Sequence, residues 1–158
     1  MFNKILVPLD GSDLAAKVIP QAEDLAKAFG AQLVLMTVGS AEVGEVGESS
    51  PEAGSEAVAR LPAVKYLEET AAALKAKNLK ATWVYKQGSS PAREIMAYAA
   101  DQKVDLIVMA THGAGEVAWL LGGVAQRVVG HAPATVLLIR VLEPKPPEHK
   151  SDLDYFSM

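Results

Sequence analysis

The sequence contains no cysteine, which excludes disulfide bonds and thiolate metal sites. Its apolar runs fall far short of the roughly 18 residues that a membrane-spanning helix needs. The five-residue apolar run near the N-terminus, Ile5–Leu9, is too short for a signal peptide. Basic residues are outnumbered by acidic ones and the formal charge is −4, so no basic excess attracts nucleic acid or anionic lipid. We therefore expect a cytoplasmic protein without nucleic-acid or membrane partners.

The chain is long enough for one domain with a proper core, and half of its residues are hydrophobic. We place that domain at residues 1–142. Within it, residues 39–60 hold four glycines and five glutamates without periodicity, which predicts a mobile acidic loop. Residues 143–158 contain three prolines and mixed charges, which predicts a flexible tail.

Apolar runs alternate with helical patterns along the domain, which predicts an α/β fold with a parallel sheet. Several of these runs lack polar alternation, as in strands buried on both faces. The five strands are expected at Ile5–Leu9, Leu33–Val38, Ala81–Lys86 (an edge strand), from Val104 to about residue 110, and at Thr135–Val141.

The helical patterns carry recognisable end signals. Ser12 can cap a helix that runs to about Phe29 and stops at Gly30, with Pro20 kinking it or delaying its regular start. Ser90 is a good N-cap for a later helix, and Pro91 suits its first turn.

A glycine-rich connection lies between the last two predicted strands. A strand, a glycine loop and a helix N-terminus together can receive phosphate, because free backbone N–H groups point outward there. The alternative is that these are ordinary turn glycines of a crossover. A dinucleotide fingerprint from Gly113 to Ala118 is rejected, since it follows a late strand and no acidic residue stands about 20 positions on. The sequence also lacks a Walker lysine motif.

Two long stretches resemble the universal stress protein family. They are "KILVPLDGSDLAAKVIPQAEDLAKAFGAQLVLMTV" near the N-terminus and "ATHGAGEVAWLLGGVAQRVVGHAPATVLLIR" near the C-terminus. The resemblance covers about residues 2–141. It implies a doubly wound five-stranded parallel sheet of order 3-2-1-4-5 with helices on both faces. It also implies ATP or AMP, with or without Mg²⁺, at the switch point where strands one and four are neighbours.

The resemblance and the strand ends together predict a set of binding residues. Asp10 and Val38 match the positions that contact the nucleoside and adenine in the family, although an Asp at this place can also be only a turn former. His112 matches a residue placed to contact a phosphate or sugar. The full set is Pro8, Leu9, Asp10, Val38, Met109, Ala110, His112, Gly113, Gly122, Gly123, Val124 and Ala125.

The glycine motif departs from that of the nucleotide-binding branch, which reads Gly-x-x-Gly, nine residues, then Gly-Ser or Gly-Thr. Ala110 replaces the first glycine. Counting nine residues from Gly113 reaches Gly123 and then Val124, whereas aligning on "VAQRV" pairs Gly122-Gly123 with Gly-Ser and shortens the loop by one residue. Both alignments remove the hydroxyl, but the backbone N–H groups of Gly122, Gly123 and Val124 are expected to remain available. The sequence thus predicts weak nucleotide binding with little preference for ATP over AMP.

Two functions follow as alternatives. The first is a universal stress protein that binds an adenine nucleotide and acts in stress response or signalling. The second is a regulatory adaptor that binds no nucleotide and works through its dimer surface. A true ATPase is less favoured and would be slow, since no catalytic residue stands out. The family pairs its last strand across a two-fold axis, so a homodimer through Thr135–Val141 is expected.

Overall fold

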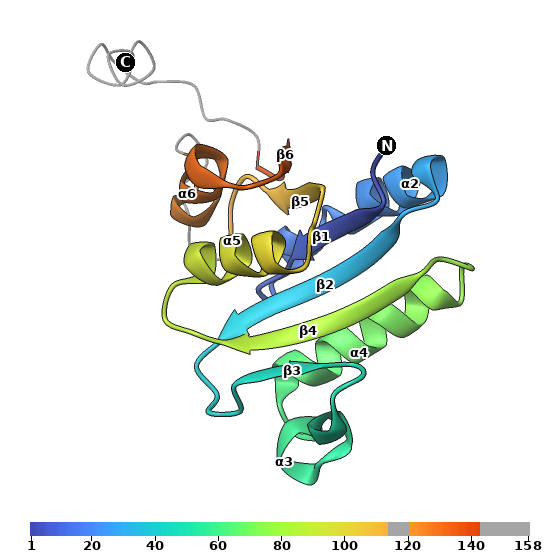
Figure 1. The fold of residues 1–158 in the computed structure, drawn as a ribbon, viewed down its shortest axis with the longest axis vertical. Helices are drawn as coiled ribbons and strands as arrows, with labels where there is room; N and C mark the ends of the chain where they lie inside the picture. Colours follow the sequence, from blue (N-terminus) through green and yellow to red (C-terminus); the bar gives the residue numbers. More distant parts are fainter. Residues whose placement is uncertain (114–120, 143–158) are drawn as a thin grey trace.

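The computed structural model describes residues 1–113 and 121–142 and builds a single six-stranded sheet from them (Figure 1). The strands are β1 (Lys4–Pro8), β2 (Gln32–Gly39), β3 (Glu45–Gly47), β4 (Ala81–Gln87), β5 (Leu106–Ala110) and β6 (Thr135–Ile139). The helices are α1 (Asp13–Ala16), α2 (Ile19–Phe29), the 3-10 helix η1 (Pro51–Gly54), α3 (Glu56–Ala59), α4 (Pro62–Lys75), α5 (Pro91–Asp101) and α6 (Gly123–His131).

The strand order is β3-β4-β2-β1-β5-β6. All neighbours from β4 to β6 are parallel, whereas β3 runs antiparallel to β4. The five parallel strands follow one another across the sheet as 3-2-1-4-5, so the predicted fold class and strand order are confirmed.

Helices cover both faces of the sheet. On one face, side chains of α2, α3 and α4 pack against Ile5, Leu33 and Trp83. On the other, α5 and α6 pack against Leu6, Val34 and other inward residues. The chain thus leaves β1 for one face and reaches α6 on the opposite face after β5, which makes β1 and β5 the topological switch point.

The acidic segment over residues 39–60 differs from its prediction. Instead of an irregular loop it contains β3, η1 and α3, and β3 covers the outer side of β4, so the prediction that Ala81–Lys86 is an edge strand is wrong. The reason is that Val46 and Val58 are buried at 1% and 3% exposure in the core beside Tyr85. The glutamates lie outside that core, and Glu45 pairs with Lys86 at 3.2 Å.

The helix ends follow the predicted signals. The Ser12 hydroxyl accepts from the Ala15 N–H at 3.1 Å and caps α1, and Ser90 caps α5 in the same way. The helix predicted up to Phe29 is divided into α1 and α2, with Pro20 in the first turn of α2, where its missing N–H costs no hydrogen bond. Gly30 ends α2 in the left-handed conformation, with φ at 65°.

The two switch-point strands separate toward their carboxyl ends. β1 pairs with β2 along its whole length, from Lys4 to Pro8, whereas its described pairs with β5 are Ile5–Leu106 and Leu6–Ile107. Pro8 has no N–H to continue the ladder. The chain then stays with β2, because the Leu9 N–H donates to the Met36 carbonyl at 2.8 Å. Space therefore opens beyond Pro8, between β1 and β5.

Candidate functional site

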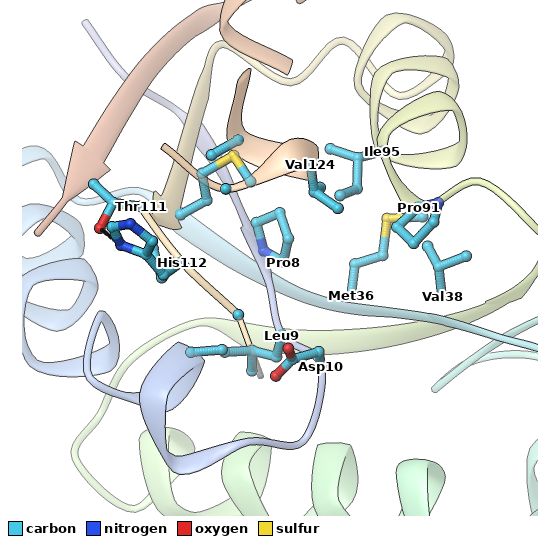
Figure 2. Close-up of a pocket in the computed structure, with 16 residues that line it drawn as sticks. Pro8, Leu9, Asp10, Met36, Val38, Pro91, Ile95, Thr111, His112 and Val124 are labelled. Carbon is cyan, nitrogen blue, oxygen red and sulfur yellow. Dashed lines mark hydrogen bonds between the residues drawn. The ribbon is translucent and has the colours of Figure 1, made fainter. Parts of the chain in front are cut away.

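A cavity of about 190 Å³ lies at this opening. It is formed at the carboxyl ends of β1, β2 and β5 and at the first turns of α5 and α6 (Figure 2). Its lining comprises Pro8, Leu9, Asp10, Ala15, Met36, Val38, Pro91, Ile95, Met109, Ala110, Thr111, His112, Gly113, Gly122, Val124 and Ala125.

The structure brings together every predicted binding residue except Gly123. That residue begins α6 just outside the lining and is exposed, and a Cβ built on it would meet no atom within 4 Å. Five lining residues were not predicted from the sequence: Ala15, Met36, Pro91, Ile95 and Thr111. Some of these carried usable signals, because Met36 is two residues before Val38 on the same strand face and Pro91 starts a helix at the same end of the sheet.

Asp10 supplies the carboxylate of the site. One of its oxygens, Oδ1, accepts hydrogen bonds from the Ser12 N–H at 2.9 Å and from the Ser12 hydroxyl, so the residue that caps α1 also orients Asp10. The other oxygen would lie 2.8 Å from a Cβ on Gly113, a separation that real Cβ atoms essentially never show. Glycine at position 113 is therefore what allows the loop after β5 to approach this carboxylate.

Thr111 and His112 form a second polar group at the cavity wall, and both are buried, at 5% and 3% exposure. The Thr111 hydroxyl lies 2.7 Å from His112 Nδ1 (Figure 2). Backbone bonds hold Thr111 in place, because its N–H donates to the Ile139 carbonyl at 3.0 Å and its carbonyl accepts from the Gly122 N–H at 2.9 Å. The polar wall is thereby fastened to β6 and to the start of α6.

The Gly122 bond corrects one expectation, because this N–H is not available to a ligand. The first bond within α6 runs from the Gln126 N–H to the Gly122 carbonyl at 2.8 Å. The N–H groups of Gly123, Val124 and Ala125 precede that bond and have no acceptor within the helix. They are the amides of α6 that can meet an anion.

The remaining wall is apolar. Met36, Val38, Pro91 and Ile95 lie together at one end of the cavity, away from Asp10 and His112 (Figure 2). Such a cavity suits a ligand with a flat or apolar part and a hydroxyl-bearing part. In the described part of the chain, no three His, Asp or Glu side chains are grouped to hold a metal ion. None of the helices in that part has the length and apolar character that crossing a membrane requires.

The parallel sheet and its switch-point cavity place the chain in the doubly wound α/β class, whose ligands bind at this position. The model of the universal stress protein family matches residues 1–140, and the chain belongs to this family.

Individual relatives agree with this assignment. The chain is 32% identical to the universal stress protein YxiE of Bacillus subtilis over 149 residues, which are 89% of this chain and 100% of the relative. It is 34% identical to the universal stress protein MJ0531 of Methanocaldococcus jannaschii, covering 89% of this chain and 83% of the relative. Its fold is similar to a crystal structure of a universal stress protein in complex with cAMP, with a TM-score of 0.67 and 22% identity over 89% and 98% of the two chains.

Proposed function

We propose that this protein binds an adenine nucleotide, ATP or AMP, in the switch-point cavity and acts in stress response or signalling in the cytoplasm. The observation that carries the proposal is the convergence of Asp10, His112 and the apolar residues Met36 and Val38 on one cavity at the carboxyl ends of β1, β2 and β5. The similarity in fold to a universal stress protein in complex with cAMP supports the same ligand class.

The two ends of the cavity suit the two parts of a nucleoside. The slot between Met36, Pro91 and Ile95 offers apolar contact to a base, and the Asp10 carboxylate can accept hydrogen bonds from ribose hydroxyls. A phosphate would meet the Gly123, Val124 and Ala125 amides at the start of α6. Any Mg²⁺ would be held mainly by the phosphates themselves, as is usual for this ion.

Catalysis is not part of the proposal. No lysine or arginine occurs among the described residues that line the cavity, and these are the side chains that usually stabilise the transferring phosphoryl group. We expect at most slow phosphate release. Sustained release at about 1 per second, a rate at the low end of ordinary enzymes, would instead make the protein an ATPase.

Titration calorimetry with ATP, AMP and adenosine tests the binding. Asp10→Asn should weaken each ligand by roughly tenfold or more, since a hydrogen bond to a charged group is worth about 1.5–3 kcal/mol. Asp13→Asn removes a carboxylate that lies outside the cavity lining and should leave all three affinities unchanged. Undetectable binding of all three ligands at millimolar concentration would contradict the proposal.

The adaptor function is retained as the alternative because a specific surface favours it. Leu137 on β6 and Val129 on α6 are large apolar side chains that are exposed, at 38% and 49%. Mass spectrometry of the protein after native purification separates the two functions. A co-purified adenine nucleotide supports the binding protein, whereas an empty site combined with failed titrations supports the adaptor.

A further inference from the structure

Two buried hydroxyl groups, those of Thr37 and Tyr85, adjoin the switch-point cavity without lining it. Thr37 stands on β2 between the lining residues Met36 and Val38, so its side chain points to the opposite face of the sheet. Tyr85 is its partner on β4 and belongs to the core on that face. Both side chains are buried, at 6% and 2% exposure, so their hydroxyl groups need hydrogen-bond partners within the protein.

The Thr37 hydroxyl holds the backbone that leads into Asp10. It donates to the Leu9 carbonyl at 2.9 Å, one residue beyond the end of β1. The Leu9 N–H also bonds to β2, because it donates to the Met36 carbonyl at 2.8 Å. Both backbone polar groups of Leu9 are therefore bound to β2. The position from which the Asp10 side chain starts is fixed by these two bonds.

The Tyr85 hydroxyl holds the turn that follows Val38. It accepts from the Ala41 N–H at 2.9 Å. Its phenol passes close over Gly39, where a Cβ would collide with the hydroxyl oxygen and lie 3.0 Å from Cε2. Glycine at position 39 is therefore what lets Tyr85 reach the turn. The Gly39 carbonyl in addition accepts from the Gly88 N–H at 2.9 Å, so the turn is bonded to the end of β4 and to the residue after it.

The two hydroxyl groups support different ends of the cavity, because Asp10 and Val38 lie apart in its lining (Figure 2). A binding site depends on the residues that hold its contacting groups in place, since a small displacement weakens each contact. We propose that Thr37 and Tyr85 are positioning residues of the ligand site, Thr37 for the end that meets the sugar and Tyr85 for the end that receives the base. This inference rests on the proposed function, because it assumes that a nucleoside occupies the cavity.

Two ratios of dissociation constants, measured on the full chain, separate the two ends. The ratio of UMP to AMP reports on the fit of the base. The ratio of 2′-deoxy-AMP or 3′-deoxy-AMP to AMP reports on the contact with the sugar hydroxyls, and the larger of these two values is used. Competition of each nucleotide against radiolabelled AMP in equilibrium dialysis measures all of these constants.

Hydroxyl-deleting variants should change one ratio each. Thr37→Val should lower the sugar ratio by about threefold to tenfold, which is the effect of one hydrogen bond, and leave the base ratio unchanged. Tyr85→Phe should lower the base ratio by a similar factor and leave the sugar ratio unchanged. Thr70→Val on α4 and Tyr98→Phe on α5 are matched controls outside the cavity lining, and both ratios should stay as in the unmodified chain.

The ratios distinguish positioning from a general contribution to stability. A hydroxyl that only stabilises the fold would weaken every nucleotide by the same factor, so both ratios would stay constant. Ratios that stay constant in Thr37→Val and Tyr85→Phe, or that fall together in each of them, would overturn the positioning roles and leave nucleotide binding intact. Failure of the unmodified chain to bind AMP would instead overturn the proposed function.

Discussion

At the scale of single residues, the site depends on which side chains are absent as much as on those present. Gly113 matters because a Cβ there would collide with Asp10 Oδ2. Gly123 matters because, in one of the two alignments, it occupies the position where the nucleotide-binding branch has a hydroxyl, and a Cβ there would meet no atom within 4 Å. These two glycines thus have different roles. Gly113 permits the loop after β5 to approach Asp10, whereas Gly123 lacks the hydroxyl that could interact with a ligand.

Gly123→Ser tests the missing hydroxyl. The new side chain has room, and it would sit beside the first-turn amides of α6, where it can donate to a phosphate. We expect ATP and AMP to bind up to one or two decades more tightly, which corresponds to about 1.5–3 kcal/mol, while adenosine changes little. Calorimetry of both proteins measures this. Equal tightening of adenosine would show that the serine does not act on a phosphate, and nanomolar ATP binding by the unmodified chain would show that the hydroxyl is dispensable.

Tyr66 is a second residue with a testable consequence, this time for stability. Its hydroxyl is buried without a hydrogen-bond partner among the described residues, and the neighbouring Thr70 hydroxyl donates to the Tyr66 backbone carbonyl at 2.7 Å. Burial raises the pKa of the Tyr66 phenol, and this outweighs a lowering by the Thr70 hydroxyl, while the nearby charges of Asp10 and Asp13 add a smaller increase. Above about pH 10 the unfolded state releases this proton while the folded state retains it, so the free energy of unfolding falls as pH rises.

Urea unfolding at about pH 8 and about pH 10.5 checks the sign. At the lower pH, Tyr66→Phe should change the free energy of unfolding by less than about 1 kcal/mol, because no hydrogen bond is lost. Between the two pH values, its free energy of unfolding should fall by less than that of the unmodified chain. Tyr85→Phe is the contrast, since its hydroxyl accepts from the Ala41 N–H at 2.9 Å and its removal should cost about 1 kcal/mol at pH 8. A larger alkaline loss in Tyr66→Phe than in the unmodified chain would contradict the explanation.

At the scale of elements, helix ends and strand ends control where the cavity forms. Ser12 both caps α1 and holds Asp10, so the start of the helix and the orientation of the carboxylate are one arrangement. Pro8 ends the ladder on the β5 side of β1, which leaves room between the two strands. Gly30 ends α2 and leads the chain into β2, far from the site. A substitution at Gly30 therefore tests the stability of the fold and not ligand binding.

Two glycine-to-alanine substitutions, expected to change the free energy of unfolding in opposite directions, test this view of the helix ends. Gly30 adopts φ +65° in open space, so Gly30→Ala should lower the free energy of unfolding by about 1 kcal/mol through backbone strain alone. Gly130 lies inside α6, also in open space, and Gly130→Ala should raise it by a few tenths to 1 kcal/mol. Chemical denaturation measures both. A stabilising Gly30→Ala would mean that the left-handed conformation is not required there.

At the scale of the whole molecule, the two edges of the sheet are treated differently. The short antiparallel strand β3 covers β4 on one side, and Glu45 and Lys86 pair across that edge at 3.2 Å. On the other side β6 is the last strand of the sheet in the described part of the chain, where it pairs with β5, and its Leu137 side chain is exposed. An apolar open edge is a place where strands of two molecules pair.

We expect a homodimer through Thr135–Val141, formed by the same surface on both copies. Light scattering at micromolar concentration should give the dimer mass, and Leu137→Lys should give the monomer, because an edge lysine opposes strand pairing. Phe29→Lys is a control of similar exposure, 39%, on α2 and not on β6, although it also removes the ring contact with Phe2. Removal of residues 143–158 should leave the dimer intact. A monomeric chain that is unaffected by this deletion would contradict both strand pairing and covering of the edge by the tail.

Local signals made much of this protein predictable from its amino acids. Ser12, Pro20, Gly30 and Ser90 act within a few residues of their own position, so the ends of α1, α2 and α5 follow from the sequence. Unbroken apolar runs indicated buried parallel strands, and the family resemblance supplied their order. Asp10, His112 and Gly113 could be named because they follow strands whose carboxyl ends meet at one edge, and Met109 and Ala110 because they end β5.

Tertiary structure decided what depends on residues distant in sequence. The acidic segment contains β3 because Val46 pairs with Tyr85 and enters the core, and three scattered valines among five glutamates give no periodic pattern. Pro91 and Ile95 join the cavity because α5 packs over β2. The Gly122 N–H is lost to a ligand because the Thr111 carbonyl, eleven positions earlier in the chain, takes it. Side-chain burial and long-range hydrogen bonds are settled by the packing of whole elements, and no short stretch of sequence contains that information.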